Sequence, residues 1–130
     1  DYTRKMLDYV RSNQTLFDAS HSYTVFNAQT PLPPHARSAL SADVVNDYHK
    51  DEAHKVLDPA AATLTGAGLK VESVYKVGSA GDAIAHYARD NGFDLILMGS
   101  HGHGALARLV MGSVASQVLA QCTVPVLLVR

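Results

Sequence analysis

Residues 94–119 read DLILMGSHGHGALARLVMGSVASQVL, and this stretch decides the fold. Its first part, Asp94 to Met98, is an apolar run that predicts a strand buried on both faces, as in a parallel sheet covered by helices. Its last part predicts a helix from Ser113 to about Gln121. Between them lie four glycines, Gly99, Gly102, Gly104 and Gly112. A strand, a glycine-rich loop and a helix N-terminus together present free backbone N–H groups, which predicts a phosphate site.

Two common phosphate-binding motifs do not account for this loop. A P-loop requires a lysine after its last glycine, and no lysine follows any of these glycines. The segment GHGALA, Gly102 to Ala107, fits the relaxed dinucleotide fingerprint, but the acidic residue expected about 20 positions later is absent. The alternative to an anion site is a turn in which the glycines only satisfy backbone dihedral angles.

Outward from this stretch, helix-like and strand-like segments alternate along the chain. Helices are expected over residues 3–19, 43–65, 79–91 and 113–121, and strands over 22–27, 69–77, 94–98 and 124–129. Such alternation favours a parallel α/β sheet. Pro59 predicts a kink or a break in the second helix near Asp58. Three further prolines, Pro31, Pro33 and Pro34, predict an exposed, extended loop.

The alternation begins on a helix, although the first helix of such a fold normally crosses over from a central strand. The chain also begins at Asp1 without a methionine. We therefore expect either a four-stranded sheet or a native protein with a first strand upstream of Asp1.

Composition excludes several classes of protein. The 130 residues predict one domain, and 11 Lys+Arg against 12 Asp+Glu form no basic stripe for nucleic acid. No apolar run approaches the ~20 residues of a membrane span, and no signal peptide opens the chain. The single cysteine, Cys122, excludes an internal disulfide and is interpreted as a core residue. A cytoplasmic protein is expected.

The spacing of three glycines and a hydroxyl is the most specific motif. Gly99, Gly102 and Gly112-Ser113 follow the pattern G-x2-G-x9-G-[ST], which resembles the ATP-binding branch of the universal stress protein family. The Pro-rich loop, the segment VGSAGDAI and the closing VPVLLV extend the resemblance over residues 1–130. It implies one α/β domain with a doubly wound, five-stranded parallel sheet in the order 3-2-1-4-5 and helices on both faces, whose first strand is missing from the sequence.

The resemblance also implies an ATP site, with Mg or Mn expected beside the phosphates. Adenine is expected against the backbone at Ala28, with Met98 as an apolar floor or simply a core residue. His103 is expected to line the phosphates or to face solvent, and Arg108 to reach the outer phosphates or to be a surface arginine. The residues assigned to the nucleotide are Ala28, Met98, Gly99, Gly102, His103, Arg108, Gly112, Ser113 and Val114. The aspartate that family members carry after their first strand has no counterpart here.

No catalytic set accompanies these residues. His101 and His103 could bind a metal, but no third ligand is near them in sequence. The sequence therefore predicts a binding module. The resemblance implies a nucleotide-sensing regulator of the stress response and a homodimer formed through the C-terminal strand. Two alternatives stay open: an enzyme that slowly hydrolyses ATP or transfers phosphate, and an interaction protein that binds no nucleotide.

Overall fold

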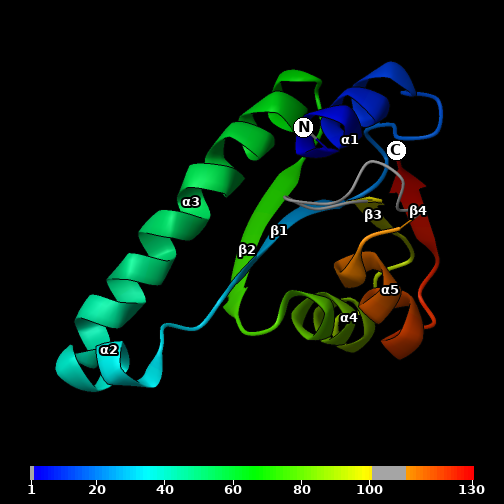
Figure 1. The fold of residues 1–130 in the computed structure, drawn as a ribbon. Coiled ribbons are helices and arrows are strands. Elements are labelled where there is room, and N and C mark those ends of the chain that lie inside the picture. The colour runs from blue at the N-terminus through cyan, green and yellow to red at the C-terminus, as the bar shows by residue number, and fades with distance from the viewer. Residues whose placement is uncertain (1, 101–110) are drawn as a thin grey trace. The chain divides into compact units, whose positions relative to one another are not determined.

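The structure, a computed structural model, describes residues 2–100 and 111–130. Figure 1 shows its elements, which follow one another in the order α1, β1, α2, α3, β2, α4, β3, α5, β4. The chain divides into two compact units. Unit 1 comprises Asp1–His21 and Gly81–Arg130, and unit 2 comprises Ser22–Ala80.

Unit 2 is a parallel strand pair covered by a long helix. β1 (Tyr23–Gln29) and β2 (Val71–Val77) are rich in β-branched and aromatic residues, which favour extended backbone. They pair in parallel, from Tyr23 opposite Val71 to Gln29 opposite Val77. The crossover between them holds α2 (Pro34–Ala39) and α3 (Ala42–Gly66), and α3 packs on both strands.

Both ends of α3 are set by local hydrogen bonds. The N-cap Ser41 accepts a hydrogen bond on its Oγ from the Val44 N–H at 3.2 Å. At the other end, Gly68 has a φ of +87°, and the Leu69 N–H reaches back to the Leu64 carbonyl at 3.2 Å. This is a Schellman-type ending that glycine favours, and α3 ends one residue after the expected end at residue 65.

The structure corrects two expectations for this region, a break at Pro59 and a Pro-rich loop without a helix. α3 runs through Pro59 without a break. Proline removes only one backbone N–H from the helix, and the helix continues on both sides of it. The Pro-rich loop contains the short helix α2, whose N-terminal Pro34 is compatible with a first helical turn. The apolar residues Tyr48 and Val56 of α3 are 44% and 46% exposed. The residues of α3 that are buried are His49, Ala53, Leu57, Ala60 and Leu64.

Unit 1 is built around a second parallel strand pair. β3 (Ile96–Gly99) pairs with β4 (Val126–Val129), from Ile96 opposite Val126 to Gly99 opposite Val129. The helices are α1 (Tyr2–Ser12), α4 (Ala80–Asp90) and α5 (Ser113–Gln121), and α1 contacts both strands. α5 has the bounds that the sequence predicts.

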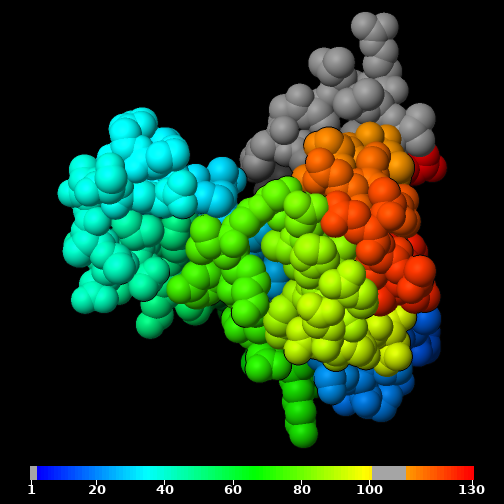
Figure 2. Space-filling view, turned by 90° about the horizontal axis from the view of Figure 1, so that it is seen from below, coloured from blue at the N-terminus to red at the C-terminus, as the bar shows by residue number. Residues whose placement is uncertain are grey.

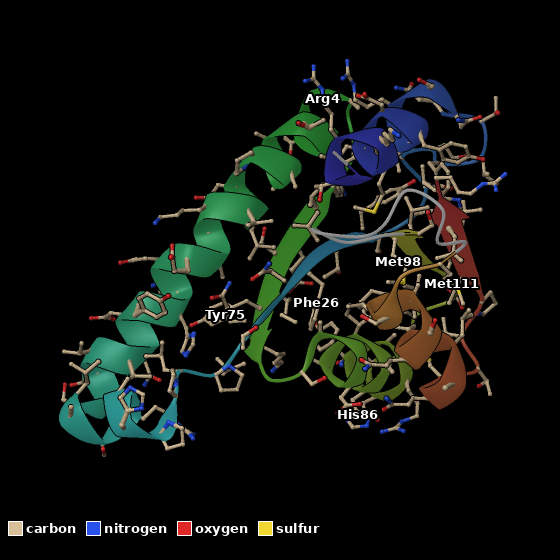
Figure 3. The ribbon with its side chains drawn as sticks, in the orientation of Figure 1. Arg4, Phe26, Tyr75, His86, Met98 and Met111 are labelled. Atoms are coloured by element: carbon tan, nitrogen blue, oxygen red, sulfur yellow. The ribbon has the colours of Figure 1, made fainter. Side chains whose placement is uncertain are left out.

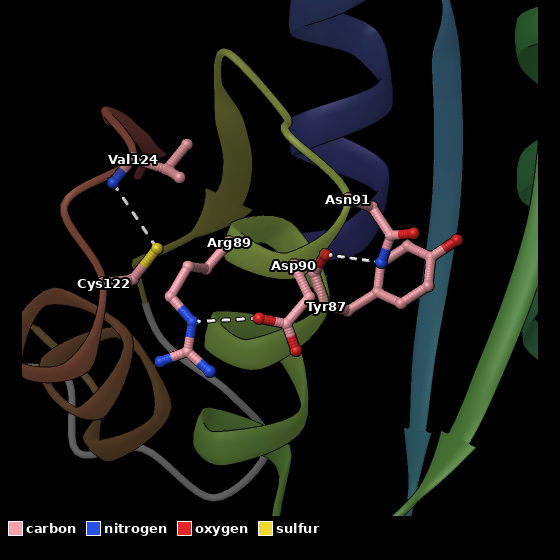
Figure 4. Close-up of polar contacts among 6 residues, drawn as sticks. All are labelled: Tyr87, Arg89, Asp90, Asn91, Cys122 and Val124. Atoms are coloured by element: carbon pink, nitrogen blue, oxygen red, sulfur yellow. Dashed lines mark hydrogen bonds and ion pairs between the residues drawn. The ribbon is translucent and has the colours of Figure 1, made fainter.

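The helices α1 and α4 of unit 1 both end in turns. α1 ends at Ser12, earlier than expected, yet Phe17 beyond it is buried and lies edge-on to Tyr9 at 6.0 Å. α4 ends before Gly92, which has a φ of +66°. The side-chain Nδ2 of Asn91 donates a hydrogen bond to the Tyr87 carbonyl at 2.9 Å (Figure 4). α4 therefore ends one residue before the expected end at residue 91.

The four strands form two separate parallel pairs rather than one sheet. The pairs β1–β2 and β3–β4 correspond to neighbours 2–3 and 4–5 of the expected order. Among the described residues, no strand pairs with the second edge of β1 or of β3. The expectation that Asp94 to Met98 is buried on both faces was wrong, since β3 begins at Ile96 and its residues are half-buried beside a single partner strand.

Candidate functional site

The backbone of Ser100 joins the end of β3 to the start of α5. Its N–H donates to the Val129 carbonyl at 3.0 Å, which extends the β3–β4 ladder by one step. Its carbonyl accepts a hydrogen bond from the Gly112 N–H at 2.6 Å. Residues 101–110 lie between these two positions in the sequence and outside the described residues. Both flanks of this segment are therefore held together by a backbone hydrogen bond.

These two flanking residues are also the most protected part of the site. Ser100 is 1% exposed, and Gly112 is buried. Sequence reasoning did not select Ser100, because a serine after a strand is common in turns and carries no motif of its own. Its position directly after Gly99 in the glycine pattern was the available signal.

The N-terminus of α5 offers hydrogen-bond donors without a side-chain cap. Gly112 is the N-cap, with φ −75° and ψ 168°, and has no side chain to accept the first N–H groups. The first turn carries no acidic residue. The ladder begins with the Ser116 N–H donating to the Gly112 carbonyl at 3.1 Å. The N–H groups of the preceding residues, with the positive end of the helix dipole, suit an anion.

The described part of unit 1 brings together five of the predicted site residues. Met98 and Gly99 lie half-buried on β3, where they pair with Leu128 and Val129. Gly112, Ser113 and Val114 form the start of α5, with Ser113 exposed and Val114 half-buried. Figure 3 labels Met98 on β3 and Met111 just before α5.

The other four predicted residues fall outside the described part of unit 1. Gly102, His103 and Arg108 lie outside the described residues. Ala28 belongs to unit 2, where it lies within β1 opposite Lys76 rather than just after the strand. The sequence assignment therefore placed the end of β1 about two residues too early, since the strand continues to Gln29.

Two exposed groups outside the candidate site, Asp18 and Lys55, have shifted pKa values. The hydroxyl and the N–H of Ser20 lower the pKa of Asp18, with His21 contributing less. The Glu52 carboxylate, 2.6 Å from Lys55 Nζ, raises the pKa of that lysine.

No group of three or more metal-binding side chains is found in residues 2–100 and 111–130. Within the same ranges, no helix has both the length and the apolar character needed to cross a membrane.

Comparison with protein families finds a match over most of the chain. The model of the universal stress protein family matches residues 16–130. Universal stress protein Slr1230 of Synechocystis is 46% identical over 74 residues, which are 57% of this chain and 26% of that protein. Universal stress protein YxiE of Bacillus subtilis is 33% identical over 88 residues, which are 68% of this chain and 60% of that protein. The matched regions thus span less than two thirds of these relatives.

Solved structures support the fold. MJ0577 of Methanocaldococcus jannaschii superposes with a TM-score of 0.79 at 24% identity, covering 99% of this chain and 87% of that one. A universal stress protein family member of Arabidopsis thaliana, solved with AMP bound, gives 0.69 at 15% identity over 99% and 82%. The Archaeoglobus fulgidus universal stress protein in complex with dAMP gives 0.66 at 20% identity over 100% and 89%.

Proposed function

Because the chain belongs to the universal stress protein family, we propose that it binds ATP and acts as a nucleotide-sensing regulator of the stress response. The observation that carries the proposal is the join between Ser100 and Gly112, which holds the end of β3 beside the uncapped start of α5. The AMP and dAMP complexes of structural relatives support a nucleotide as the ligand class.

Each proposed contact follows from the chemistry of its residue. The N–H groups of Ser113 and Val114 lie in the first turn of α5, where a helix favours negative charge. Gly99 and Gly102 present backbone without side chains that could block phosphate oxygens. The proposal assigns Arg108 to the outer phosphates and His103 to the lining of the phosphate site.

The remaining contacts concern the base and the metal. Met98 supplies apolar surface from β3, and Ala28 supplies backbone for the adenine. Mg or Mn would arrive with the phosphates, because ATP carries its own oxygen ligands for such ions. Bound metal would neutralise phosphate charge, while the protein contributes the orienting N–H groups.

The proposal also places both units in one domain. A further parallel strand that joined the free edges of β1 and β3 would complete the order 3-2-1-4-5. The pairs β1–β2 and β3–β4 are the neighbours which that order requires on its two sides.

A charge test at Ser113 separates binding from folding. An aspartate in the first turn of a helix stabilises the helix by about 0.3–1 kcal/mol, so Ser113→Asp should leave unfolding unchanged or raise its midpoint. The same carboxylate would repel phosphates, so titration calorimetry with MgATP should show binding weakened by about tenfold or more. Ser113→Asn is the uncharged control of equal size.

A steric test addresses the glycines. Gly102→Val and Gly112→Val place side chains at the proposed phosphate contacts, and Gly66→Val is the control, since a Cβ at Gly66 meets nothing within 4 Å. Gly112 has an extended backbone that valine can adopt. Unchanged MgATP affinity in a folded double variant would refute this site. Linear release of ADP over time, lost in the same variant, would identify an enzyme instead of a sensor.

A further inference from the structure

α3 is much longer than the strands it covers. Its 25 residues make a helix of about 37 Å, whereas the seven residues of β1 or β2 span about 23 Å. The C-terminal end of α3 is tied to the start of β2 by the turn at Gly68. The excess of about 14 Å therefore lies at the N-terminal end, where α2 and the first turns of α3 extend past the strands (Figure 1).

This overhanging end is built from residues that do not favour a helix. The seven residues from Asp43 to His49 read DVVNDYH, and every one of these residue types belongs to the weaker helix formers. Burial compensates little, because within this run only His49 is buried. A segment whose local preferences oppose its structure is expected where function requires that structure.

The outward face of the overhang combines an apolar and an acidic row. Val44 and Tyr48, one turn apart, are 50% and 44% exposed. Asp47 and Asp51 lie beside them at the same four-residue spacing, and both are exposed. These four residues are called the α3 patch. Figure 2 shows α2 and the start of α3 in cyan at the surface of the molecule.

The two aspartates of the α3 patch are only partly balanced by charges of the helix itself. They lie beyond the first turn, where Asp43 already meets the helix dipole. Like charges at four-residue spacing destabilise a helix. Among the described residues, neither aspartate lies within ion-pair distance of a cation. Lys55, one turn further on, contacts Glu52 at 2.6 Å and is also attracted by Asp51, whereas Asp47 has no such partner in residues 2–100 and 111–130.

We propose that the α3 patch is a docking surface for a basic amphipathic helix of a partner protein. The apolar row would bury Val44 and Tyr48 against the apolar face of the partner. Lysine or arginine residues at four-residue spacing beside that face would meet Asp47 and Asp51, and would remove the repulsion between them. Tyrosine is enriched among residues that dominate binding energy, which makes Tyr48 the expected anchor.

Charge argues against a second copy of this chain as the occupant. Two α3 patches packed face to face would bring the aspartates of one copy toward those of the other. Like charges juxtaposed across an interface disfavour association. A partner of opposite charge satisfies both rows at once.

Fluorescence anisotropy with a synthetic peptide tests this surface. The probe is an amphipathic helix of about 18 residues, long enough to be helical when bound, with leucines on one face and lysines at four-residue spacing beside them. Tyr48→Ser should weaken its binding by about tenfold. Asp47→Asn with Asp51→Asn should weaken binding and flatten its dependence on salt concentration.

Matched controls come from β2. Val44→Ser is a third variant of the α3 patch. The exposed fraction of Val77, 47%, is close to the 50% of Val44, so Val77→Ser controls for the loss of an exposed valine. Glu72→Gln controls for loss of one exposed negative charge. The proposal is overturned if a scrambled peptide of equal composition binds as tightly, or if the patch variants bind like these controls. It is also overturned if sedimentation shows self-association that Tyr48→Lys abolishes.

Discussion

Gly81 on α4 lies against Gln117 on α5 with no room for a side chain between them. A Cβ added at Gly81 would lie 2.5 Å from the Gln117 Cβ and would overlap the end of the same side chain. Next to this contact, Gln121 Nε2 donates to Asp82 Oδ1 at 2.5 Å. The start of α4 and the body of α5 therefore meet at a glycine, and this contact borders the helix whose N-terminus forms the candidate site.

Gly81→Ala is expected to destabilise the protein. Alanine favours a helix over glycine by about 1 kcal/mol, but overpacking a close contact costs about 1–3 kcal/mol, and the Gln117 Cβ cannot rotate away. We expect a net loss of about 1 kcal/mol in the free energy of unfolding, measured by urea denaturation followed by circular dichroism.

Gly66→Ala is the matched control for this change. Gly66 ends α3, and a Cβ there meets no atom within 4 Å. Stability should stay equal or rise slightly, because only helix propensity changes. Equal effects of both alanines on unfolding would show that the contact between α4 and α5 is not close.

The buried imidazole of His49 is expected to lower the free energy of unfolding of the protein. Its side chain is 3% exposed, and its Nδ1 has no hydrogen-bond partner in the part of the chain that the structure describes. A buried polar group left unpaired costs about 1–3 kcal/mol, so His49→Leu, of similar volume, should raise the free energy of unfolding by about that amount. His35→Leu on the exposed surface of α2 is the control. A loss of stability in His49→Leu would contradict this prediction and imply an important polar contact at Nδ1.

The carboxylate of Asp18 should titrate below its ordinary pKa of 3.8. It accepts hydrogen bonds from the Ser20 hydroxyl at 2.5 Å and the Ser20 N–H at 2.9 Å. Because the native pKa is lowered, the associated stability is present above the unfolded value and is lost as pH falls through the native value. Ser20→Ala removes the largest cause, so the Asp18 pKa should rise in a carboxyl-detected NMR titration. No change would show that the hydroxyl bond is absent in solution.

Much of the fold follows from patterns in the sequence. The alternation of elements predicts that the strands pair in parallel. The bounds of α5 are also as expected, because Gly112 and Ser113 mark its start. The glycines that end α3 and α4 were also recognisable, since Gly68 and Gly92 adopt the positive φ that glycine tolerates.

Other features depend on tertiary context that no local pattern carries. Tyr48 lies outward and His49 inward, although hydrophobicity favours the reverse, because the direction of α3 over the strands decides which face is buried. Ser100 gains its role from meeting Gly112, a contact set by where the chain returns. Local propensity likewise did not predict α2 within its run of prolines.

The edge of β4 decides how two copies would assemble. The carbonyls of Pro125 and Val129 accept hydrogen bonds from Ile96 and Ser100 at 2.9 and 3.0 Å. Because backbone groups alternate sides along a strand, Val126 and Leu128 direct their N–H and C=O groups away from β3. No described strand pairs with this second edge. We therefore expect a symmetric homodimer in which β4 pairs with its copy.

Proline substitutions test the dimer without relying on side-chain charge. Leu128→Pro removes a donor from the free edge and leaves the β3 ladder intact, so it should give a folded monomer. Leu127→Pro removes a donor that faces β3 and leaves its acceptor unpaired, so it should lower the free energy of unfolding by about 1–3 kcal/mol. Leu128→Ala accounts for the loss of the half-buried side chain and should remain dimeric. Light scattering after size exclusion measures the mass of each variant. The assembly would be contradicted if the parent protein were monomeric at tens of micromolar, on the order of the concentration at which a specific interface is populated. Another segment would then have to pair with the second edge of β4.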